Sequence, residues 1–361
     1  MTNITVLVTN IYKCGGVQRV VSMLANNLVG TGKYKITILS MFKTADNPYF
    51  DLNEDIVVNN IYNEHFSLKR GYFKAVRGLK KFFDKNKTDI LIFAGMGYGS
   101  IVRLAISRRQ NIKLIGWEHQ SFFFGKKFGL EWLGKRIAAA HMDAVVVLTK
   151  EDYKYYKDNL KNIKKIEQIY NPINEKVKSG NYKSNSQAII SCGGLVPQKG
   201  FDYAVDVARI VFAKHPNWQW HIYGDGIERS ILENKINGYH LENNLILKGY
   251  CENIYDKYKD YAIYAMTSRH EGFPMVLLEA KANKLPIVSF NCKCGPSEIV
   301  KDSINGYLIP CFDVKKMSEK IINLIENKEK RIQLSNNSIV GDENLSISEI
   351  VEKWDRLIQS L

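Results

Sequence analysis

The sequence contains no long uninterrupted apolar run. Nowhere do 18 apolar residues follow one another, so we expect no membrane-spanning helix. The first ten residues, MTNITVLVTN, are typical of a strand and lack the charged start and long apolar stretch of a signal peptide. These absences predict a cytoplasmic protein, either free in the cytosol or bound to the cytosolic face of a membrane.

Several common ligand-binding motifs are also missing. No P-loop occurs, and the segment IYGDGIER (222–229) does not complete the G-x-G-x-x-G pattern of dinucleotide-binding proteins. There is no Asp-x-Asp pair, the most common acidic pair for holding a divalent metal on a nucleoside diphosphate. The six cysteines form no Cys-x-x-Cys pair and no Cys/His cluster with zinc spacing. We therefore expect no metal site, and cysteines that are buried thiols of a reducing compartment.

Basic residues outnumber acidic ones. Lys and Arg number 51 against 37 Asp and Glu, which gives a formal net charge of +14. Such an excess favours anionic partners, whether nucleic acid, phospholipid headgroups or phosphorylated substrates. No helix-turn-helix or RNA-recognition signature occurs, so a non-enzymatic nucleic-acid-binding protein is the least favoured interpretation. That interpretation predicts retention on DNA or RNA with a steep salt dependence.

Short β-rich runs alternate with segments of helical periodicity along most of the chain. This alternation is typical of βαβ units and predicts parallel sheets covered by helices on both faces. The expected strands are 4–10, 34–42, 89–95, 112–119 and 143–149, then 188–194, 218–224, 244–249, 261–268 and 286–290.

The pattern divides the chain into two parts. It stops after Pro172 and restarts at Ala188, and 361 residues suit about two domains. We predict an α/β protein with an N-terminal Rossmann-like domain over 1–172 and a C-terminal one over 188–342. A linker over 173–187 joins them. A final helix is expected over 343–361, with packing against the N-terminal domain as one option.

Ligands of open parallel sheets bind beyond the carboxyl ends of the strands, where glycine-rich loops meet helix N-termini. Two loops have the required composition: Gly15-Gly16 after the first strand, and Gly193-Gly194 followed by Lys199 at the start of the second domain. Glycines there let backbone N–H groups approach a phosphate, and the lysine supplies positive charge. Tight turns and a solvated lysine are the alternative explanation.

A third loop carries two glutamates. TSRHEGFPMVLLEA (267–280) follows an expected strand, and Pro274 suits the first turn of the next helix. Glu271 lies before that helix and Glu279 inside it. A carboxylate is a good partner for a vicinal diol such as a ribose, and free amides at a helix start suit anionic oxygens. Together the loops indicate a nucleotide sugar; acidic residues at a helix start and on its solvated face are the alternative.

These segments resemble the retaining glycosyltransferases of family 4, whose two domains form the GT-B fold. The resemblance covers most of the chain and is strongest over about 188–310. The segments that carry it, in the family's order, are GGVQRV (15–20), YNPI (170–173), GGLVPQKGFD (193–202), EGFPMVLLE (271–279) and CGPSEIVKDSINGYLIP (294–310). The last of them is similar to members that build bacterial surface polysaccharides. The resemblance implies two Rossmann-like domains facing each other across a cleft.

The resemblance also implies roles for individual residues. Glu279 corresponds to the glutamate that binds the ribose hydroxyls, and Glu271 to its partner at the donor sugar. Lys199 corresponds to the diphosphate-binding lysine. His119 resembles a histidine near the donor sugar, with a purely structural histidine as the alternative. Gly15-Gly16 resemble the loop at the diphosphate and the acceptor. The other residues expected at the nucleotide sugar are Gly194, Asn171, Phe273, Pro274, Met275 and Val276.

One position departs from the family pattern. The usual motif reads GRLxxxKG, with an arginine beside the diphosphate, and Gly194 stands at the position of that arginine. One positive charge is therefore missing unless Arg269 or Arg19 supplies it from elsewhere. The departure bears on the strength of diphosphate binding and not on the reaction class.

The reaction implied is transfer of a hexose or N-acetylhexosamine from a UDP-sugar to a lipid-linked saccharide. The resemblance implies retention of anomeric configuration and no requirement for a metal or cofactor, so Lys199 and helix amides would stabilise the departing diphosphate. The choice of UDP follows the habit of the family. A UDP-sugar epimerase of the same fold is the alternative enzyme, and detectable transfer to a lipid acceptor separates the two.

Two basic segments suit an anionic membrane surface. Segment 68–87 holds eight Lys/Arg against one acid, and segment 120–136 places aromatic residues among lysines. Both predict peripheral association with the cytosolic face of the inner membrane, where a lipid-diphosphate acceptor would lie. If the apolar side chains instead face the domain core, the lysines are simply solvated. The apolar residues at helical spacing in 68–87 are Leu68, Tyr72, Val76, Leu79 and Phe83.

Overall fold

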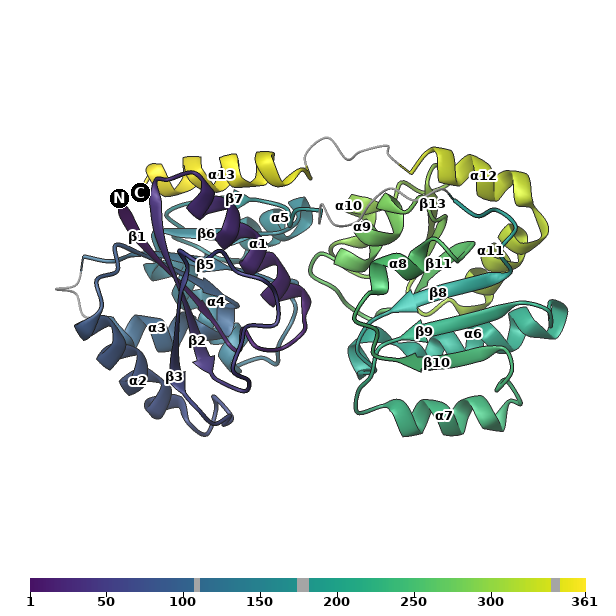
Figure 1. Ribbon diagram of the computed structural model, residues 1–361, viewed down its shortest axis with the longest axis horizontal. Helices are drawn as coiled ribbons and strands as arrows, with labels where there is room; N and C mark the ends of the chain where they lie inside the picture. Colours follow the sequence, from purple (N-terminus) through teal and green to yellow (C-terminus); the bar gives the residue numbers. More distant parts are fainter. Residues whose placement is uncertain (107–110, 174–181, 339–344) are drawn as a thin grey trace. The chain divides into compact units, whose positions relative to one another are not determined.

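The computed structural model describes residues 1–106, 111–173, 182–338 and 345–361 (Figure 1). The chain forms two compact units: unit 1 comprises Met1–Pro172 and Asn344–Leu361, and unit 2 comprises Ile173–Glu343. The final helix therefore belongs to the same unit as the first strand. Most of the predicted linker (174–181) and the segment 339–344 lie outside the described residues.

Unit 1 is built on a seven-stranded sheet with the strand order β3-β2-β1-β4-β5-β6-β7. All neighbouring strands pair in parallel. Strands β4 (ILIFA) and β6 (AVVV) are buried along their whole length, as a parallel sheet covered on both faces requires. The strands are β1 (Thr2–Val8), β2 (Tyr34–Phe42), β3 (Val57–Tyr62), β4 (Ile90–Ala94), β5 (Lys113–Trp117), β6 (Ala144–Val147) and β7 (Ile166–Gln168).

Two groups of helices pack on this sheet. Apolar side chains of α2, α3 and α4 join the strands in one hydrophobic cluster, whereas α1 packs with α13 (Figure 1). The helices of unit 1 are α1 (Gly16–Gly30), α2 (Tyr72–Lys85), η1 (Met96–Tyr98), α3 (Gly99–Ala105), α4 (Leu130–His141), α5 (Lys150–Asn159) and α13 (Ile347–Gln359).

Helix α13 is anchored to unit 1 by an aromatic pair and a polar cluster. The buried ring of Trp354 lies 4.8 Å from that of Trp117 in β5, measured between centroids. Asp355 accepts hydrogen bonds from Lys33 Nζ at 2.7 Å and from the Tyr34 hydroxyl. Burial and the Asp355 carboxylate raise the pKa of Tyr34 to about 12, so its hydroxyl remains a donor at neutral pH. The last helix is thus an integral part of unit 1.

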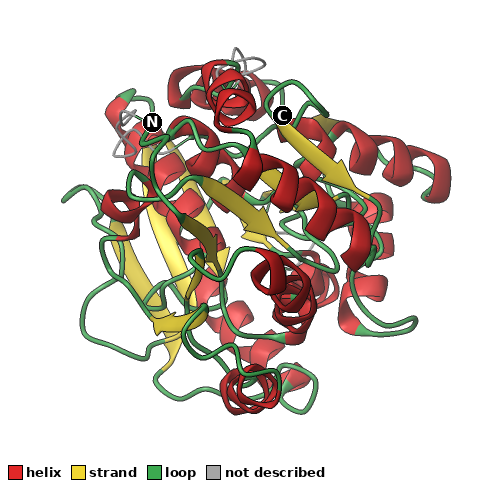
Figure 2. Cartoon of the chain, turned by 90° about the vertical axis from the view of Figure 1, so that its right-hand side faces the viewer, coloured by secondary structure: helices red, strands yellow, loops and turns green. Residues whose placement is uncertain are grey.

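Unit 2 contains a six-stranded parallel sheet in the order β10-β9-β8-β11-β12-β13. Helices, red in Figure 2, lie around the strands, which are yellow. The strands are β8 (Ala188–Cys192), β9 (Gln219–Tyr223), β10 (Leu245–Gly249), β11 (Ile263–Met266), β12 (Ile287–Phe290) and β13 (Gly306–Ile309). The helices are η2 (Pro197–Lys199), α6 (Phe201–Lys214), α7 (Arg229–Gly238), α8 (Ile254–Tyr258), α9 (Met275–Ala282), α10 (Pro296–Ile299), α11 (Val314–Glu326) and α12 (Lys328–Asn336).

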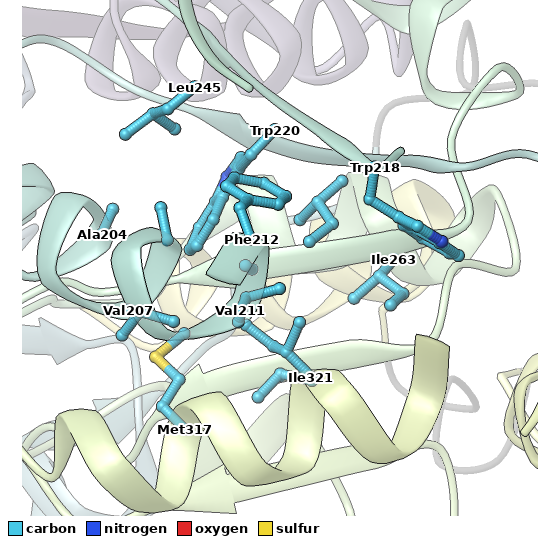
Figure 3. Packing of buried hydrophobic residues seen from close by; sticks show 14 of the residues in the cluster. Ala204, Val207, Val211, Phe212, Trp218, Trp220, Leu245, Ile263, Met317 and Ile321 are labelled. Carbon is cyan, nitrogen blue, oxygen red and sulfur yellow. The ribbon is translucent and has the colours of Figure 1, made fainter. Parts of the chain in front are cut away.

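A continuous core joins the sheet of unit 2 to α6 and α11. Val211 of α6 and Met317 and Ile321 of α11 belong to it, together with the fully buried Trp220 of β9 (Figure 3). The Trp220 indole N–H donates to Ser191 Oγ at 2.9 Å, so this large side chain is buried without losing its hydrogen bond. The core fixes β8 and β9 and, with them, the start of the loops that follow.

The predicted fold class, two α/β domains each built on a parallel sheet, is confirmed. All ten predicted strands are present, β2 with the predicted ends and the other nine with shifted ends. Strands β3, β7 and β13 were not predicted. All three are edge strands, and β3 (VVNNIY) and β7 (IEQ) are partly exposed and polar, so they lack the apolar run that marks a central strand.

Two expectations about surfaces are corrected by the structure. Cys14 is exposed and Cys251 and Cys311 are half-buried, whereas the prediction was that all cysteines are buried. In α2, Leu79 and Phe83 are buried in the core and Tyr72 and Val76 pack against it, so this apolar stripe is no membrane-binding face. The alternative, that these side chains face the core, is confirmed. None of the helices in the described part of the chain has both the length and the apolar composition to cross a membrane.

Candidate active site

The strand order of unit 2 reverses between β8 and β11, and the loops that follow these strands are joined by hydrogen bonds. The Arg269 amide donates to the Gln198 carbonyl at 2.8 Å, and Gln198 Nε2 donates to the His270 carbonyl at 3.0 Å. Thr267 Oγ1 donates to the Lys199 carbonyl at 3.2 Å. Open α/β sheets bind their ligands at such a switch point. The geometry of unit 2 therefore places its candidate site on these two loops.

A glycine makes the close approach of the two loops possible. Gly200 separates η2 from α6 and has a left-handed backbone with a φ of +62°. A Cβ atom at this position would lie 2.2 Å from the carbonyl oxygen of Thr267. Any other residue would therefore push the β11 loop away from the segment that carries Lys199.

Lys199 and Glu271, predicted separately, form an ion pair. Lys199 Nζ lies 2.8 Å from Glu271 Oε1, and the side chains are 21% and 7% exposed. The pair fixes both groups, because a largely buried carboxylate is costly without a charged partner. The ammonium group has three N–H donors, so it can bind a ligand oxygen while it retains Glu271. This arrangement suits an anionic ligand that also carries hydroxyl groups.

Arg269 was one of two residues considered as a substitute for the missing arginine charge, but in the structure its guanidinium is bound within the protein. It forms a two-pronged ion pair with Asp202, at 2.8 Å and 2.6 Å, and donates to the Pro197 carbonyl at 2.7 Å. Burial acts to raise the pKa of Asp202, but the hydrogen bonds and charge of Arg269 outweigh it and lower that pKa. The charge of Arg269 is thus balanced locally, and the residue ties the β11 loop to the start of α6.

Glu279 lies in the interior of α9 and is only 3% exposed. Its Oε2 accepts a hydrogen bond from the Tyr258 hydroxyl at 2.7 Å. Pro274 directly precedes the helix, one position before the first turn in which it was expected. The other residues predicted at this helix start are the buried Phe273 and Met275 and the half-buried Val276. Unit 2 therefore brings both glutamates to one loop and its helix.

Gly194, at the position of the missing arginine, is exposed. A Cβ atom added there would meet one atom within 4 Å, the Asp225 carbonyl oxygen at an ordinary contact distance of 3.7 Å. The backbone φ of Gly194 is not positive, so the position does not require a left-handed conformation. The position therefore has room for a side chain, and the structure itself does not demand a glycine.

The remaining predicted residues belong to unit 1. Gly15-Gly16 precede α1, His119 follows β5 by two residues, and Asn171 follows β7. All of them lie beyond the carboxyl ends of parallel strands. Among the described residues, neither His119 Nε2 nor Asn171 Oδ1 has a hydrogen-bond partner, although both atoms are buried. Buried polar atoms are normally paired, so these two are suited to a polar ligand.

His119 is held as a neutral imidazole. Burial lowers its pKa to about 3, and its ring lies 4.3 Å from that of Trp117, between centroids. At neutral pH the ring therefore carries one N–H donor and one acceptor and no net charge. Such a group can hydrogen-bond a sugar hydroxyl, but it does not provide a positive charge.

A buried lysine shapes the loop that follows His119. Lys135 Nζ donates to three main-chain carbonyls between Ser121 and Phe124, at 2.8 to 3.0 Å, and lies 3.3 Å from a carboxylate oxygen of Glu118. Glu118 also accepts a hydrogen bond from the Tyr156 hydroxyl at 2.7 Å. The whole group is buried, so it fixes the conformation of the loop in unit 1.

Two family models match the chain: glycosyl transferases group 1 over residues 172–340 and glycosyltransferase family 4 over residues 14–177. Over 358 residues the chain is 31% identical to an uncharacterized glycosyltransferase of Haemophilus influenzae, covering 99% of this chain and 100% of the relative. This chain belongs to the glycosyltransferases. The prediction of a transferase is confirmed, and the alternative of a non-enzymatic nucleic-acid-binding protein is wrong.

Two further comparisons extend this result. The glycosyltransferase is 24% identical over 353 residues, 95% of each chain, to a Campylobacter jejuni enzyme named as an α-1,4-N-acetyl-D-galactosaminyltransferase acting on a diNAcBac-PP-undecaprenol glycan. It also resembles a crystal structure of TarM from S. aureus, in complex with fondaparinux, α-GlcNAc-glycerol and UDP, with a TM-score of 0.82 and 18% identity over 99% of each chain. This likeness confirms the predicted GT-B fold.

Three residues of the glycosyltransferase's candidate site were not singled out in the sequence: Gln198, Asp202 and Tyr258. Asp202 lies in the first turn of α6, and an acid so close to Lys199 is a local signal that could have been used. Gln198 makes its contacts from η2, which at three residues is too short to show a periodicity in the sequence. Tyr258 precedes Glu279 by 21 residues and contacts it through the fold, which no motif spacing reveals.

Proposed function

We propose that this glycosyltransferase moves a hexose or N-acetylhexosamine from a UDP-sugar to a lipid-linked saccharide, with retention of anomeric configuration, in bacterial surface-polysaccharide synthesis such as O-antigen or capsule. The observation that carries the proposal is the Lys199–Glu271 ion pair at the switch point of unit 2. Beside it α9 carries the buried Glu279. The cation suits a diphosphate, and the two fixed acids suit the hydroxyl groups of a sugar on one side of it and of a ribose on the other.

In this proposal each group binds one part of the donor. Glu279 accepts hydrogen bonds from the ribose hydroxyls, Lys199 contacts the diphosphate, and Glu271 contacts hydroxyls of the sugar. UDP is favoured as the nucleotide because the structurally similar TarM was crystallised with UDP.

The chemical step breaks the bond between the anomeric carbon and the β-phosphate oxygen. A hydroxyl oxygen of the acceptor forms the new bond on the same face of the sugar, and its proton passes to the departing diphosphate. Negative charge grows on that diphosphate in the transition state, where a cation held in advance is most effective. The Glu271 carboxylate holds the Lys199 ammonium in place for this purpose and is not assigned the role of a covalent nucleophile.

The proposed acceptor is a saccharide on a lipid diphosphate at the cytosolic face of the inner membrane. The name of the Campylobacter relative specifies an undecaprenol diphosphate glycan. On the solvent side of α2 the basic side chains remain available for anionic headgroups, together with Phe73, which is 71% exposed. Near α4, Phe128 is 76% exposed and the Arg136 guanidinium lies 3.6 Å from the Trp132 ring centroid. Exposed aromatics beside cations are typical of peripheral membrane surfaces.

The function is tested by screening a panel of UDP-, GDP- and ADP-sugars for thermal stabilisation, followed by transfer to membrane lipid extract. We expect stabilisation by one or more UDP-sugars and a lipid product one sugar heavier by mass spectrometry. Conversion of the donor into its epimer without any transfer would instead identify a UDP-sugar epimerase. Stabilisation by none of the sugars would overturn the proposal.

Gly194→Arg is expected to strengthen UDP binding about three- to tenfold, because it adds a cation beside the diphosphate where the structure leaves room. The gain should shrink as salt is raised, since exposed charges are screened. Calorimetric titration with UDP measures it. Gly194→Leu adds bulk without charge and is the matched control; equal affinities of the two variants would contradict a diphosphate at this position.

Transfer is expected to proceed unchanged in EDTA. The proposed site relies on Lys199 rather than on a metal, and the sequence offers no Asp-x-Asp pair. In the described parts of the two units, no group of three His, Cys, Asp or Glu side chains is arranged to hold an ion. The measurement is the rate of UDP release with and without chelator. A loss of rate that magnesium restores would contradict a metal-independent reaction.

A further inference from the structure

A buried phenol lies directly against the glutamate that we assign to the ribose. Tyr258, the last residue of α8, is 0% exposed, and its hydroxyl donates to Glu279 Oε2 at 2.7 Å. This distance is the normal length of a hydrogen bond from an O–H donor to an oxygen acceptor. Tyr258 therefore fixes one oxygen of the carboxylate.

The surroundings hold the phenol in place and keep it protonated. The ring of Tyr264, on β11, lies 6.0 Å from that of Tyr258 in a stacked arrangement with 23° between the planes. Burial, and then the neighbouring Cys192 and Glu279, raise the pKa of Tyr258 well above its ordinary value. Tyr258 is therefore a hydrogen-bond donor, and never a charged group, throughout the pH range in which an enzyme works.

A carboxylate has about four acceptor positions on its two oxygens, and the Tyr258 hydroxyl occupies one of them. A vicinal diol presents two O–H groups with fixed spacing. To accept from both, the carboxylate must keep one orientation, and a free glutamate side chain pays conformational entropy to do so. The Tyr258 hydroxyl removes that freedom before any ligand binds.

We propose that Tyr258 is the positioning residue for the nucleotide's ribose: its hydroxyl orients the Glu279 carboxylate so that both ribose hydroxyls can bind to it. The inference rests on the proposed function, since it assigns Glu279 to the ribose. It makes α8, which follows β10, part of the donor site, although Tyr258 itself touches no substrate. Its loss should weaken only those ligands that carry the diol.

The test compares two ligands on two variants by calorimetric titration of the full chain. The ligands are UDP and its 2′,3′-dideoxy analogue, which lacks both ribose hydroxyls. For Tyr258→Phe we expect UDP binding about tenfold weaker than for the wild type, the loss of one hydrogen bond to a charged group. Binding of the dideoxy analogue should be unchanged.

Tyr261→Phe is the matched control. Tyr261 is also a buried phenol of unit 2, with its hydroxyl 2.8 Å from His221 Nδ1 and 2.9 Å from the Tyr223 hydroxyl, and it makes no hydrogen bond to Glu279. This variant should bind both ligands as the wild type does. Incorporation of 4-aminophenylalanine at position 258, which restores an N–H donor on the ring, should recover most of the UDP affinity.

Each outcome decides the question. If Tyr258→Phe weakens both ligands equally, the hydroxyl only supports the fold and the inference is overturned. If wild-type protein prefers UDP over the dideoxy analogue and Tyr258→Phe shows the same preference, the inference fails while the proposed function stands. If the wild type binds UDP and the analogue equally, or binds no nucleotide, the ribose role of Glu279 falls and the inference falls with it.

Discussion

Replacement of Lys199 by methionine is expected to lower kcat about 10²–10³-fold, the usual effect of removing one preorganised group that stabilises transition-state charge. Methionine keeps the length of the side chain and removes only the ammonium, which in the structure is held 2.8 Å from Glu271. In the proposed reaction the diphosphate would then depart without its cation. UDP release under saturating donor and acceptor measures the effect, and the KM for the donor should change less than kcat.

A second ion-paired lysine of unit 2 provides the control. Lys183 lies 2.7 Å from Asp260, and both side chains are exposed. Lys183→Met removes a comparable ion pair that does not lie at the switch point of unit 2. This substitution should leave kcat unchanged. Thermal unfolding of both variants shows whether each is folded. Equal kcat values for Lys199→Met and the wild type would remove Lys199 from the diphosphate site.

Trp354→Ala is expected to lower the free energy of unfolding of unit 1 by about 3–5 kcal/mol, the usual cost of truncating a buried tryptophan. Trp354 is fully buried and packs on Trp117, which in turn contacts His119. The substitution leaves a cavity under α13 and removes the aromatic partner of Trp117. Urea unfolding followed by circular dichroism measures the loss.

Arg356→Ala is the control on the same helix. The Arg356 side chain is 68% exposed and pairs with Glu352 one turn away. Its removal should change stability by no more than about 0.5 kcal/mol, as is usual for exposed ion pairs. If both variants unfold at the same urea concentration, α13 does not stabilise unit 1 in the way that its packing indicates.

Central strands could be predicted from the sequence because burial on both faces forces a continuous apolar run, as in ILIFA of β4. The edge strand β3 could not, because its partly exposed VVNNIY is compatible with a loop. The division into α/β domains follows from alternation alone. The assignment of α13 to unit 1 does not follow from this alternation, because it depends on the contact between Trp354 and Trp117, which are far apart in the chain.

The same distinction applies to the candidate site. Lys199 and Glu271 could be proposed because each lies just beyond a strand, where the fold class expects ligands. Their direct contact depends on β8 and β11 being neighbours, which the order of elements does not reveal. The pairing of Arg269 with Asp202 is likewise a property of the folded loops. A charge can therefore be located from a motif, but whether it faces a ligand or a protein partner cannot.

The assignment of α13 to unit 1 has a consequence for biosynthesis. Unit 2 is one continuous stretch, Ile173–Glu343, whereas unit 1 is completed only by Asn344–Leu361. At ~5–20 residues per second, a ribosome needs on the order of ten to thirty seconds to make the intervening stretch. During that interval the nascent first unit exposes the apolar surface around Trp117 that α13 later covers. The part of the chain that is made first is therefore the last to be completed.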